Sequence, residues 1–351
     1  AYDEAQALLQ TTICDASVAD ATTDRLLNAL RRVGKEGAAE DDSMNKILEK
    51  AEYEKYELNG VQKTNGAEKN GDPYDGASEL VIVNGSTVYS QHLAASVIDS
   101  GLETSVSKNI KAIIVKGNFD SGAWTCFDGL TGLEVIIFDN PNITELGYAM
   151  VRNCTSLKYA YISDNVTNLK KGNSTNKQSA FYGCSSLKEL TIPVSAKIYN
   201  SSYVFCNCTN IEKITLTKGN GTMVEYGTVT TAPSDIVNYQ YTPWYISRSN
   251  LKELVIEEGV CTISSYAFGN CTKLENIILP DGITSIGKNA FYYCTGLKNI
   301  TLPNSITSIG ENAFYYCTAL ENTYYNGDIA DWCKIIFTNA YSTPMYYADN
   351  L

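Results

Sequence analysis

The sequence has one histidine, three tryptophans and eight prolines in 351 residues, and it lacks the run of about 18 apolar residues that a membrane-spanning helix needs. Its 27 lysines and arginines are outnumbered by 39 aspartates and glutamates, which gives a formal net charge of −12. Phosphate contacts need clusters of basic side chains, so the composition disfavours a nucleic-acid partner. Ala1 is preceded by no initiator methionine or signal peptide, as we expect of a trimmed chain.

The chain is rich in self-similarity. The phrase AFYYCT opens at Ala290 and returns at Ala313, and Cys271, Cys294 and Cys317 are spaced 23 residues apart. Each of these cysteines follows a phenylalanine by three positions, and the first two precede a Leu-x-x-Ile-x-Leu segment. A fixed period of 20 to 50 residues is typical of a repeat architecture.

Weaker copies of this template extend the pattern upstream, and two of them lack the cysteine. They are centred on Leu130, Cys154, Cys184, Cys208 and Arg248, the last with Tyr245 at its aromatic position. We therefore predict eight coils, each donating one short strand to a parallel ladder with apolar residues inward and polar residues outward. Stacking buries faces that one coil cannot bury alone, and eight strands about 4.8 Å apart give a ladder on the order of 40 Å long.

The cysteines of the repeat are predicted to form a buried column with parallel side chains. Disulfides need Cβ vectors that face each other, so we expect reduced core thiols. The predicted repeat core includes Phe181, Cys184, Phe205, Cys208, Phe268, Cys271, Phe291, Cys294, Phe314 and Cys317.

The alternatives for these cysteines are a zinc site or a nucleophile. Zinc needs Cys or His pairs at short spacing, and only Cys206 with Cys208 comes close. A cysteine nucleophile needs a histidine partner, and the one histidine, His92, precedes the repeats, where we expect a capping or partly exposed role. The sequence predicts no catalytic residue, no metal and no cofactor.

The repeat phrase I-T-S-I-G-x-x-A-F-x-x-C-T-x-L-x-x-I-x-L-P resembles the BspA-type leucine-rich repeat family over residues 109–340. The resemblance implies an α/β repeat solenoid, a right-handed coil with a parallel strand ladder. It also implies an extracellular or cell-surface binding or adhesion protein of a bacterium, with no catalytic residues to carry over. The stretch YYNGDIADWCKIIF, residues 324–337, resembles a segment that further repeats commonly follow, so the tail at 341–351 would precede more repeats.

The residues before the repeats differ in kind. Residues 1–58 have the apolar stripes and caps of helices, which predicts a small helical segment. Residues 59–78 are rich in Gly, Asn and Lys and read as a linker. Residues 79–108 are predicted to cap the solenoid with a helix and a hairpin, whose turn lies at Asn84-Gly85.

Departures from the period indicate where a ligand could bind, because insertions in a solenoid map to loops. Insertions lie near 170–176 and 217–243. The second insertion and the outward strand positions supply candidate ligand contacts, namely Ile137, Tyr159, Tyr161, Tyr226, Tyr239, Tyr241 and Trp244. The alternative is that these aromatic residues only cover the wall of the solenoid, and that Tyr292, Tyr293, Tyr315 and Tyr316 on the opposite turn are repeat filler.

Charged residues follow the first strand leucine of most coils, with glutamates beside lysines, and this alternation predicts a solvated face. Three functions remain. The favoured one is a non-catalytic surface or secreted protein that binds a host extracellular protein or glycan. The second is a spacer that presents another domain, and the third is an acidic glycoside hydrolase on a solenoid scaffold.

Overall fold

The computed structural model describes residues 55–59, 80–85, 110–117, 127–139, 143–147, 149–169, 179–198, 204–224 and 242–348. The chain divides into two units, 1–53 and 54–351, and the described residues all belong to the second. Several predictions lie outside the described residues: most of the helical segment, the linker, His92, Tyr226, Tyr239 and Tyr241.

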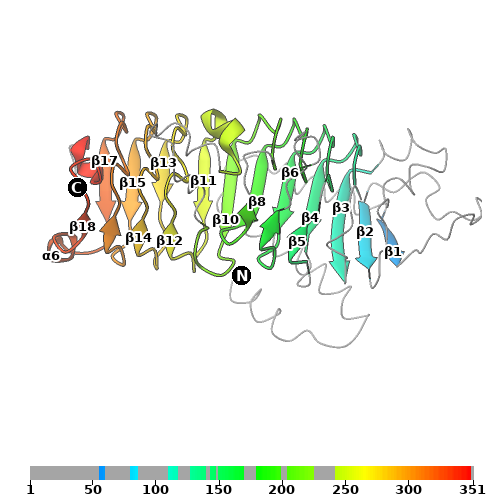
Figure 1. Ribbon diagram of the computed structural model, residues 1–351, viewed down its shortest axis with the longest axis horizontal. Helices are drawn as coiled ribbons and strands as arrows, with labels where there is room; N and C mark the ends of the chain where they lie inside the picture. The colour runs from blue at the N-terminus through cyan, green and yellow to red at the C-terminus, as the bar shows by residue number, and fades with distance from the viewer. Residues whose placement is uncertain are drawn as a thin grey trace, which may run out of the picture. The chain divides into compact units, whose positions relative to one another are not determined.

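The described unit is built on a ladder of parallel strands, which lie side by side in chain order (Figure 1). An eight-stranded sheet has the order β1-β2-β3-β4-β6-β8-β10-β11, and β11 lies beside the three-stranded sheet β13-β15-β17. The strands are β1 (Lys55–Asn59), β2 (Leu80–Gly85), β3 (Ala112–Gly117), β4 (Val135–Phe138), β6 (Tyr159–Ile162), β8 (Glu189–Pro193), β10 (Lys213–Thr217), β11 (Glu253–Ile256), β13 (Asn276–Ile278), β15 (Asn299–Leu302) and β17 (Asn322–Tyr325).

Two further sheets of very short strands form the second wall of the coils. Their orders are β5-β7-β9 and β12-β14-β16-β18, and all pairs are parallel. The strands are β5 (Glu145–Leu146), β7 (Asn168–Leu169), β9 (Lys197–Ile198), β12 (Thr262–Ile263), β14 (Ser285–Ile286), β16 (Ser308–Ile309) and β18 (Ile336–Phe337).

Helical structure is scarce in the described ranges. It consists of the four-residue helix α6 (Ile329–Trp332) and the 3-10 helices η3 (Tyr245–Asn250) and η4 (Pro344–Tyr346). A coil of 23 residues that holds two strands and two tight turns has no length left for an α-helix. The described coils therefore form a parallel β-solenoid, and the expected α/β alternation is absent from them.

The structure corrects two predictions made for the residues before the repeats. Residues 55–59 form strand β1, although they were expected partly in a helix. Asn84 and Gly85 lie inside strand β2, where they pair in parallel with β3, while β1 occupies the other edge of β2. With both edges occupied by parallel neighbours, β2 has no place for the antiparallel partner of the predicted hairpin. The ladder thus begins upstream of residue 109.

One turn position explains how most coils reverse direction, and the exception is the coil of Arg248, which turns through η3. The residue before the repeat cysteine adopts positive φ in the left-handed region, where Gly and Asn are least strained. These residues are Gly129, Asn153, Gly183, Asn207, Asn270, Tyr293 and Tyr316. The last two coils therefore place a bulky tyrosine where the others use Gly or Asn, and the left-handed conformation costs such a residue about 1–2 kcal/mol.

Glycine is needed at a second turn for a different reason, which is close approach between coils. A Cβ added at Gly287 would lie 2.5 Å from the backbone nitrogen of Ser265, and one at Gly310 would lie 2.6 Å from that of Lys288. This contact accounts for the glycine in the repeated phrase S-I-G.

Aromatic rings stack along the interior of the coils. Phe268, Phe291 and Phe314 are fully buried, with successive ring centroids 5.6 and 5.5 Å apart. Trp244 extends this column, because its ring stacks on Phe268 at 5.2 Å and its Nε1 donates to the carbonyl of Ala267 at 2.8 Å. The sequence template placed Tyr245 at this position. The tryptophan fills it instead, since the turn through η3 shifts the aromatic position by one residue.

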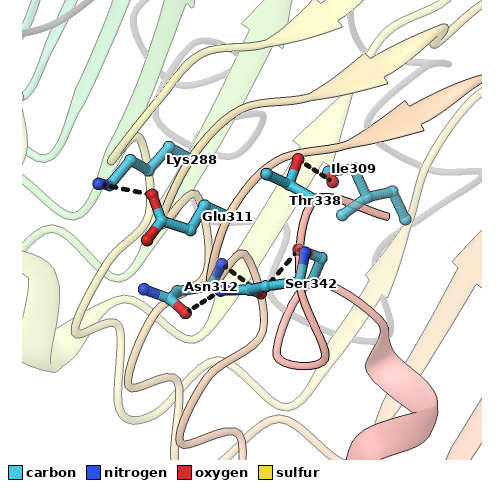
Figure 2. A network of polar contacts seen from close by, with 7 residues as sticks. Lys288, Ile309, Glu311, Asn312, Thr338 and Ser342 are labelled. Carbon is cyan, nitrogen blue, oxygen red and sulfur yellow. Dashed lines mark hydrogen bonds and ion pairs between the residues drawn. The ribbon is translucent and has the colours of Figure 1, made fainter. Parts of the chain in front are cut away.

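The last coil docks on its predecessor through polar side chains (Figure 2). Asn339 donates to the side chain of Asn312 at 2.7 Å, Ser342 donates to Asn339 at 2.9 Å, and the Thr338 hydroxyl donates to the carbonyl of Ile309 at 3.3 Å. The rings of Tyr325 and Phe337 both contact Trp332 of α6, which packs against the end of the core.

Candidate binding surface

The repeat cysteines form part of the core. Cys294 and Cys317 are fully buried and free, and their thiols donate to the carbonyls of Phe268 and Phe291 one coil earlier, each at 3.2 Å. Burial raises the pKa of the Cys294 thiol to about 12. A protonated thiol that donates to a backbone carbonyl serves the fold, because a nucleophile or metal ligand must be a thiolate.

The charged residues beside the ladder pair between neighbouring coils. Lysine ammonium groups contact glutamate carboxylates of the adjacent coil in several rungs. The pairs are Glu134 with Lys158 at 2.6 Å, Glu212 with Lys252 at 2.8 Å, and Glu275 with Lys298 at 2.8 Å. Each of these partly exposed pairs contributes at most about 1 kcal/mol to stability, as is typical of charge pairs on a solvated face.

The predicted contact patch on the first half of the ladder is largely buried. Ile137 of β4 is only 4% exposed, Tyr159 of β6 is also buried, and Tyr161 is half-buried. The outward positions of β3 and β4 are apolar as well, with Ile114 and Val135 buried. The prediction of an exposed patch is therefore wrong for Ile137 and Tyr159, because an outward position in a ladder is open to solvent only where nothing packs on that face.

The prediction for Trp244 is also wrong. It was expected in an exposed insertion, but it is 1% exposed and forms the end of the stacked aromatic column. The neighbouring Tyr245 stays partly exposed, and the guanidinium of Arg248 lies 4.0 Å from its ring centroid. The residue that resembled a surface anchor thus belongs to the core.

The last three rungs of the ladder present an exposed face that the sequence did not single out. Outward positions of β13, β15 and β17 carry Ile278, Thr301 and Tyr324 in register. Ile278 is 70% exposed and Tyr324 is 53% exposed, while the inward neighbours Ile277 and Ile300 are buried. The alternation of inward and outward positions along each strand is the sequence signal that could have found them.

A row of asparagines runs beside these residues on the same side of the sheet. Asn299 donates to Asn276 at 2.7 Å, and Asn322 donates to Asn299 at 2.8 Å. Side chains at i and i+2 of a strand share a face, so this row holds the rungs next to Ile278 and Tyr324 at a fixed spacing. We call the six residues Asn276, Ile278, Asn299, Thr301, Asn322 and Tyr324 the outer ladder face.

A second feature lies after the strands of the middle coils. Asp164 accepts hydrogen bonds from the Thr217 hydroxyl and from the Gly219 amide, the latter at 3.2 Å. Burial, and then the charge of Asp164, raises the pKa of Glu257 to about 7, which the charge of Lys218 opposes. Burial and the same carboxylates also raise the pKa of Tyr161. Glu257 is thus a carboxyl group that changes charge near neutral pH.

Two searches of the described ranges were negative. Across these residues, His, Cys, Asp and Glu side chains nowhere gather in a group of three that could hold a metal ion. The same part of the chain has no helix with the length and apolar character needed to cross a membrane.

Comparison with known protein families matches the BspA type leucine rich repeat region, in six copies, at residues 104–176, 168–228 and 244–350. The matched residues cover well over half of the chain. A search of curated proteins finds no match.

Solved structures similar to this chain include three bacterial leucine-rich repeat proteins. A leucine rich cell surface protein from Faecalibacterium prausnitzii has 16% identity and a TM-score of 0.31, over 80% of this chain and 92% of that one. A protein from Bacteroides ovatus has 17% identity and a TM-score of 0.28, over 62% and 59% of the two chains. A protein from T. pallidum has 16% identity and a TM-score of 0.28, over 68% and 77%.

Proposed function

The chain belongs to the BspA-type leucine-rich repeat family, and we propose that it is a non-catalytic binding protein of a bacterial cell surface or its surroundings. Its partner is a host extracellular protein or glycan, which contacts the outer ladder face. The resemblance of the repeats to surface and secreted proteins supports the location.

One observation carries this proposal. Ile278 and Tyr324 are exposed on the two rungs that flank Thr301 of β15, at positions where a solvated sheet favours Thr or Lys. Large side chains held on a fixed backbone bring contact area to a complex at small entropic cost. The row of bonded asparagines beside them adds amide groups whose positions are set before a ligand arrives.

The experiment is to measure binding of the purified chain to an array of host matrix proteins and mucosal glycans. We expect a saturable interaction that Tyr324→Ala and Ile278→Ser each weaken about tenfold, as loss of a central contact does. Ile336→Ser is the matched control, because Ile336 is an equally exposed isoleucine on the other sheet. Equal loss in the control, or no loss in the two variants, would refute the outer ladder face as the contact surface.

A spacer that presents another domain is the alternative role for a regular solenoid. A spacer requires no ligand. If the full chain bound no member of the array, this result would favour the spacer role over the binding role.

A glycoside hydrolase has one observation in its favour, which is that burial and then the charge of Asp164 raise the pKa of Glu257. Glycosidases pair a carboxyl group of raised pKa with a second carboxylate, and burial and Asp164 raise the pKa of Glu257 to about 7. Turnover of a glycan that Glu257→Gln abolishes, with the fold intact, would replace the binding proposal with this one.

A further inference from the structure

A ridge of tyrosines lines the turns of the last coils, on a wall of the solenoid separate from the ladder. Its members are Tyr292, Tyr293, Tyr315, Tyr316, Tyr341, Tyr346 and Tyr347, and we call them the tyrosine ridge. Their rings form one connected row. The centroids of Tyr293 and Tyr316 lie 5.2 Å apart, those of Tyr315 and Tyr341 lie 4.2 Å apart, and those of Tyr341 and Tyr346 lie 4.8 Å apart.

Two members of the ridge have a backbone conformation that is unfavourable for tyrosine. Tyr293 and Tyr316 have φ of 60° and 61°, at the turn position where the other coils have Gly or Asn. Both rings are exposed to solvent, at 41% and 40%. Strained residues that the fold does not need to bury are found at ligand-binding sites more often than elsewhere, so these two tyrosines point to a contact surface.

The arrangement of the rings decides between ligand classes. Neighbouring rings are tilted, by 48° between Tyr293 and Tyr316 and by 50° between Tyr315 and Tyr316. Rings tilted at these angles do not form one flat platform, which disfavours stacking on the faces of several consecutive sugar units. Surfaces lined by aromatic side chains are the feature with which several domains hold proline-rich segments.

The spacing of the coils matches one peptide conformation. A polyproline II helix has three residues per turn and rises about 3.1 Å per residue, which gives about 9.3 Å per turn. Two coils of the solenoid span about 9.6 Å, twice the spacing of neighbouring strands. The ridge extends over the coils of Tyr293 and Tyr316 and on to Tyr347, whose hydroxyl accepts from the Tyr316 amide at 3.0 Å. One turn of the peptide helix therefore spans the ridge.

The charge of the chain is also compatible with a peptide ligand in the polyproline II conformation. Tyrosine side chains are neutral, and on the same turns Lys288 pairs with Glu311 at 2.8 Å (Figure 2). The chain as a whole has a net charge of −12, which disfavours acidic glycans and acidic peptides and suits a neutral or basic one. Polyproline II backbones have no internal hydrogen bonds, so their carbonyls are open to tyrosine hydroxyl donors.

We propose that the tyrosine ridge is a second binding surface, which holds a neutral or basic proline-rich segment of another protein in the polyproline II conformation. This inference rests on the binding role proposed above, but it uses a different wall of the solenoid from the outer ladder face. The two surfaces can therefore be tested separately on the full chain.

The test is a titration of the full chain with a fluorescent peptide of about nine prolines, roughly three turns of the helix. A Gly-Ser peptide of the same length and a neutral oligosaccharide serve as competing probes. We expect saturable binding of the oligoproline, with the Gly-Ser peptide at least about tenfold weaker. The double variant Tyr293→Asn with Tyr316→Asn should raise the Kd at least about tenfold. Asn occupies the same left-handed position in other coils, so circular dichroism should report an unchanged fold.

Tyr324→Asn is the matched control, since it removes an exposed tyrosine from the outer ladder face and should leave the Kd for oligoproline unchanged. No saturable binding of oligoproline, or equal binding by the double variant, would overturn the inference. Binding of the oligosaccharide that the double variant loses would assign the ridge to carbohydrate and overturn it as well. Loss of an array ligand through Ile278→Ser, with no oligoproline binding, would refute the ridge alone and leave the proposed function standing.

Discussion

The thiol of Cys317 donates a hydrogen bond to the backbone carbonyl of Phe291, 26 residues earlier and one coil away, at 3.2 Å. The same contact joins Cys294 to Phe268, Cys208 to Phe181, Cys184 to Val151 and Cys154 to Phe127. The repeat cysteine therefore links each of these coils to its neighbour. Its thiol supplies a second donor to a buried carbonyl; the Phe291 carbonyl, for example, already accepts the Cys294 amide within its own turn at 3.2 Å.

Removing one such link should destabilise the solenoid. Cys294→Ala deletes the donor to Phe268 and leaves a small cavity, and we expect a loss of about 1–2 kcal/mol in the free energy of unfolding. Urea denaturation followed by circular dichroism measures this loss. Cys333→Ala is the control, because Cys333 is exposed and its replacement should change stability by less than about 0.5 kcal/mol. Equal losses in the two variants would contradict the role of the buried thiol.

Exposed and buried cysteines should differ in their reactivity toward a thiol reagent. Cys261 and Cys333 are exposed and should react with a thiol reagent in the native protein. Burial raises the pKa of the Cys294 and Cys317 thiols, so little thiolate forms and these residues should react only after unfolding. Timed labelling followed by peptide mass spectrometry tests this, and rapid native labelling of Cys294 would show that the core is open.

Trp244 should be one of the most costly residues to truncate. Trp244→Ala removes a buried ring that stacks on Phe268, and we expect a loss of about 3–5 kcal/mol. Trp244→Phe keeps a ring in the column and should cost clearly less. Denaturation of both variants gives the comparison. If alanine at 244 were no worse than alanine at the partly exposed Tyr245, then Tyr245 would be the residue that completes the column.

The left-handed turn predicts which substitutions a coil tolerates. Asn207 has φ of 66° and an exposed side chain, so Asn207→Ala should destabilise the protein by about 1 kcal/mol through backbone strain alone. Asn207→Gly relieves the strain and should leave the melting temperature close to that of the parent chain. A larger loss for glycine than for alanine would show that the turn conformation is not the cause.

Glu257 should make stability depend on pH near neutrality. Its pKa is raised from 4.5 to about 7 by burial and by Asp164, which means that the folded state disfavours the charged carboxylate. Below pH 4.5 the group is protonated in both states and has no effect, and as the pH rises through 7 the folded state loses stability. Glu257→Gln removes this loss, so the free energy of unfolding of this variant should exceed that of the parent chain by near zero at low pH and by on the order of 3 kcal/mol above neutrality.

The neighbouring Glu258 supplies the control for this prediction, because it is exposed. Glu258→Gln removes an exposed carboxylate and should change the free energy of unfolding by less than about 0.5 kcal/mol at neutral pH. Urea titrations at a series of pH values measure both variants. If Glu257→Gln raised the free energy of unfolding by the same amount at low pH as above neutrality, the substitution would act through packing and not through the charge.

The sequence by itself determined the repeat, its period and its stacked parallel strands, because a 23-residue coil with inward apolar positions can bury them only against its neighbours. Phe291, Cys294 and Ile300 lie in the core for this reason, and the family follows from the same residues. The local pattern was misleading at Asn84-Gly85. These residues are typical of a hairpin turn, but in the assembled ladder they lie in strand β2, which pairs in parallel with β1 and β3.

Exposure was decided by the tertiary structure. Ile137 and Ile278 occupy equivalent outward positions in their strands, yet the first is buried and the second is exposed. Trp244 was indistinguishable from a surface aromatic until its ring was placed on Phe268. A strand pattern specifies which face a side chain takes, but what packs against that face depends on residues far away in the chain. The exposure of the candidate binding surfaces, unlike the existence of the coils, was therefore decided only by the tertiary structure.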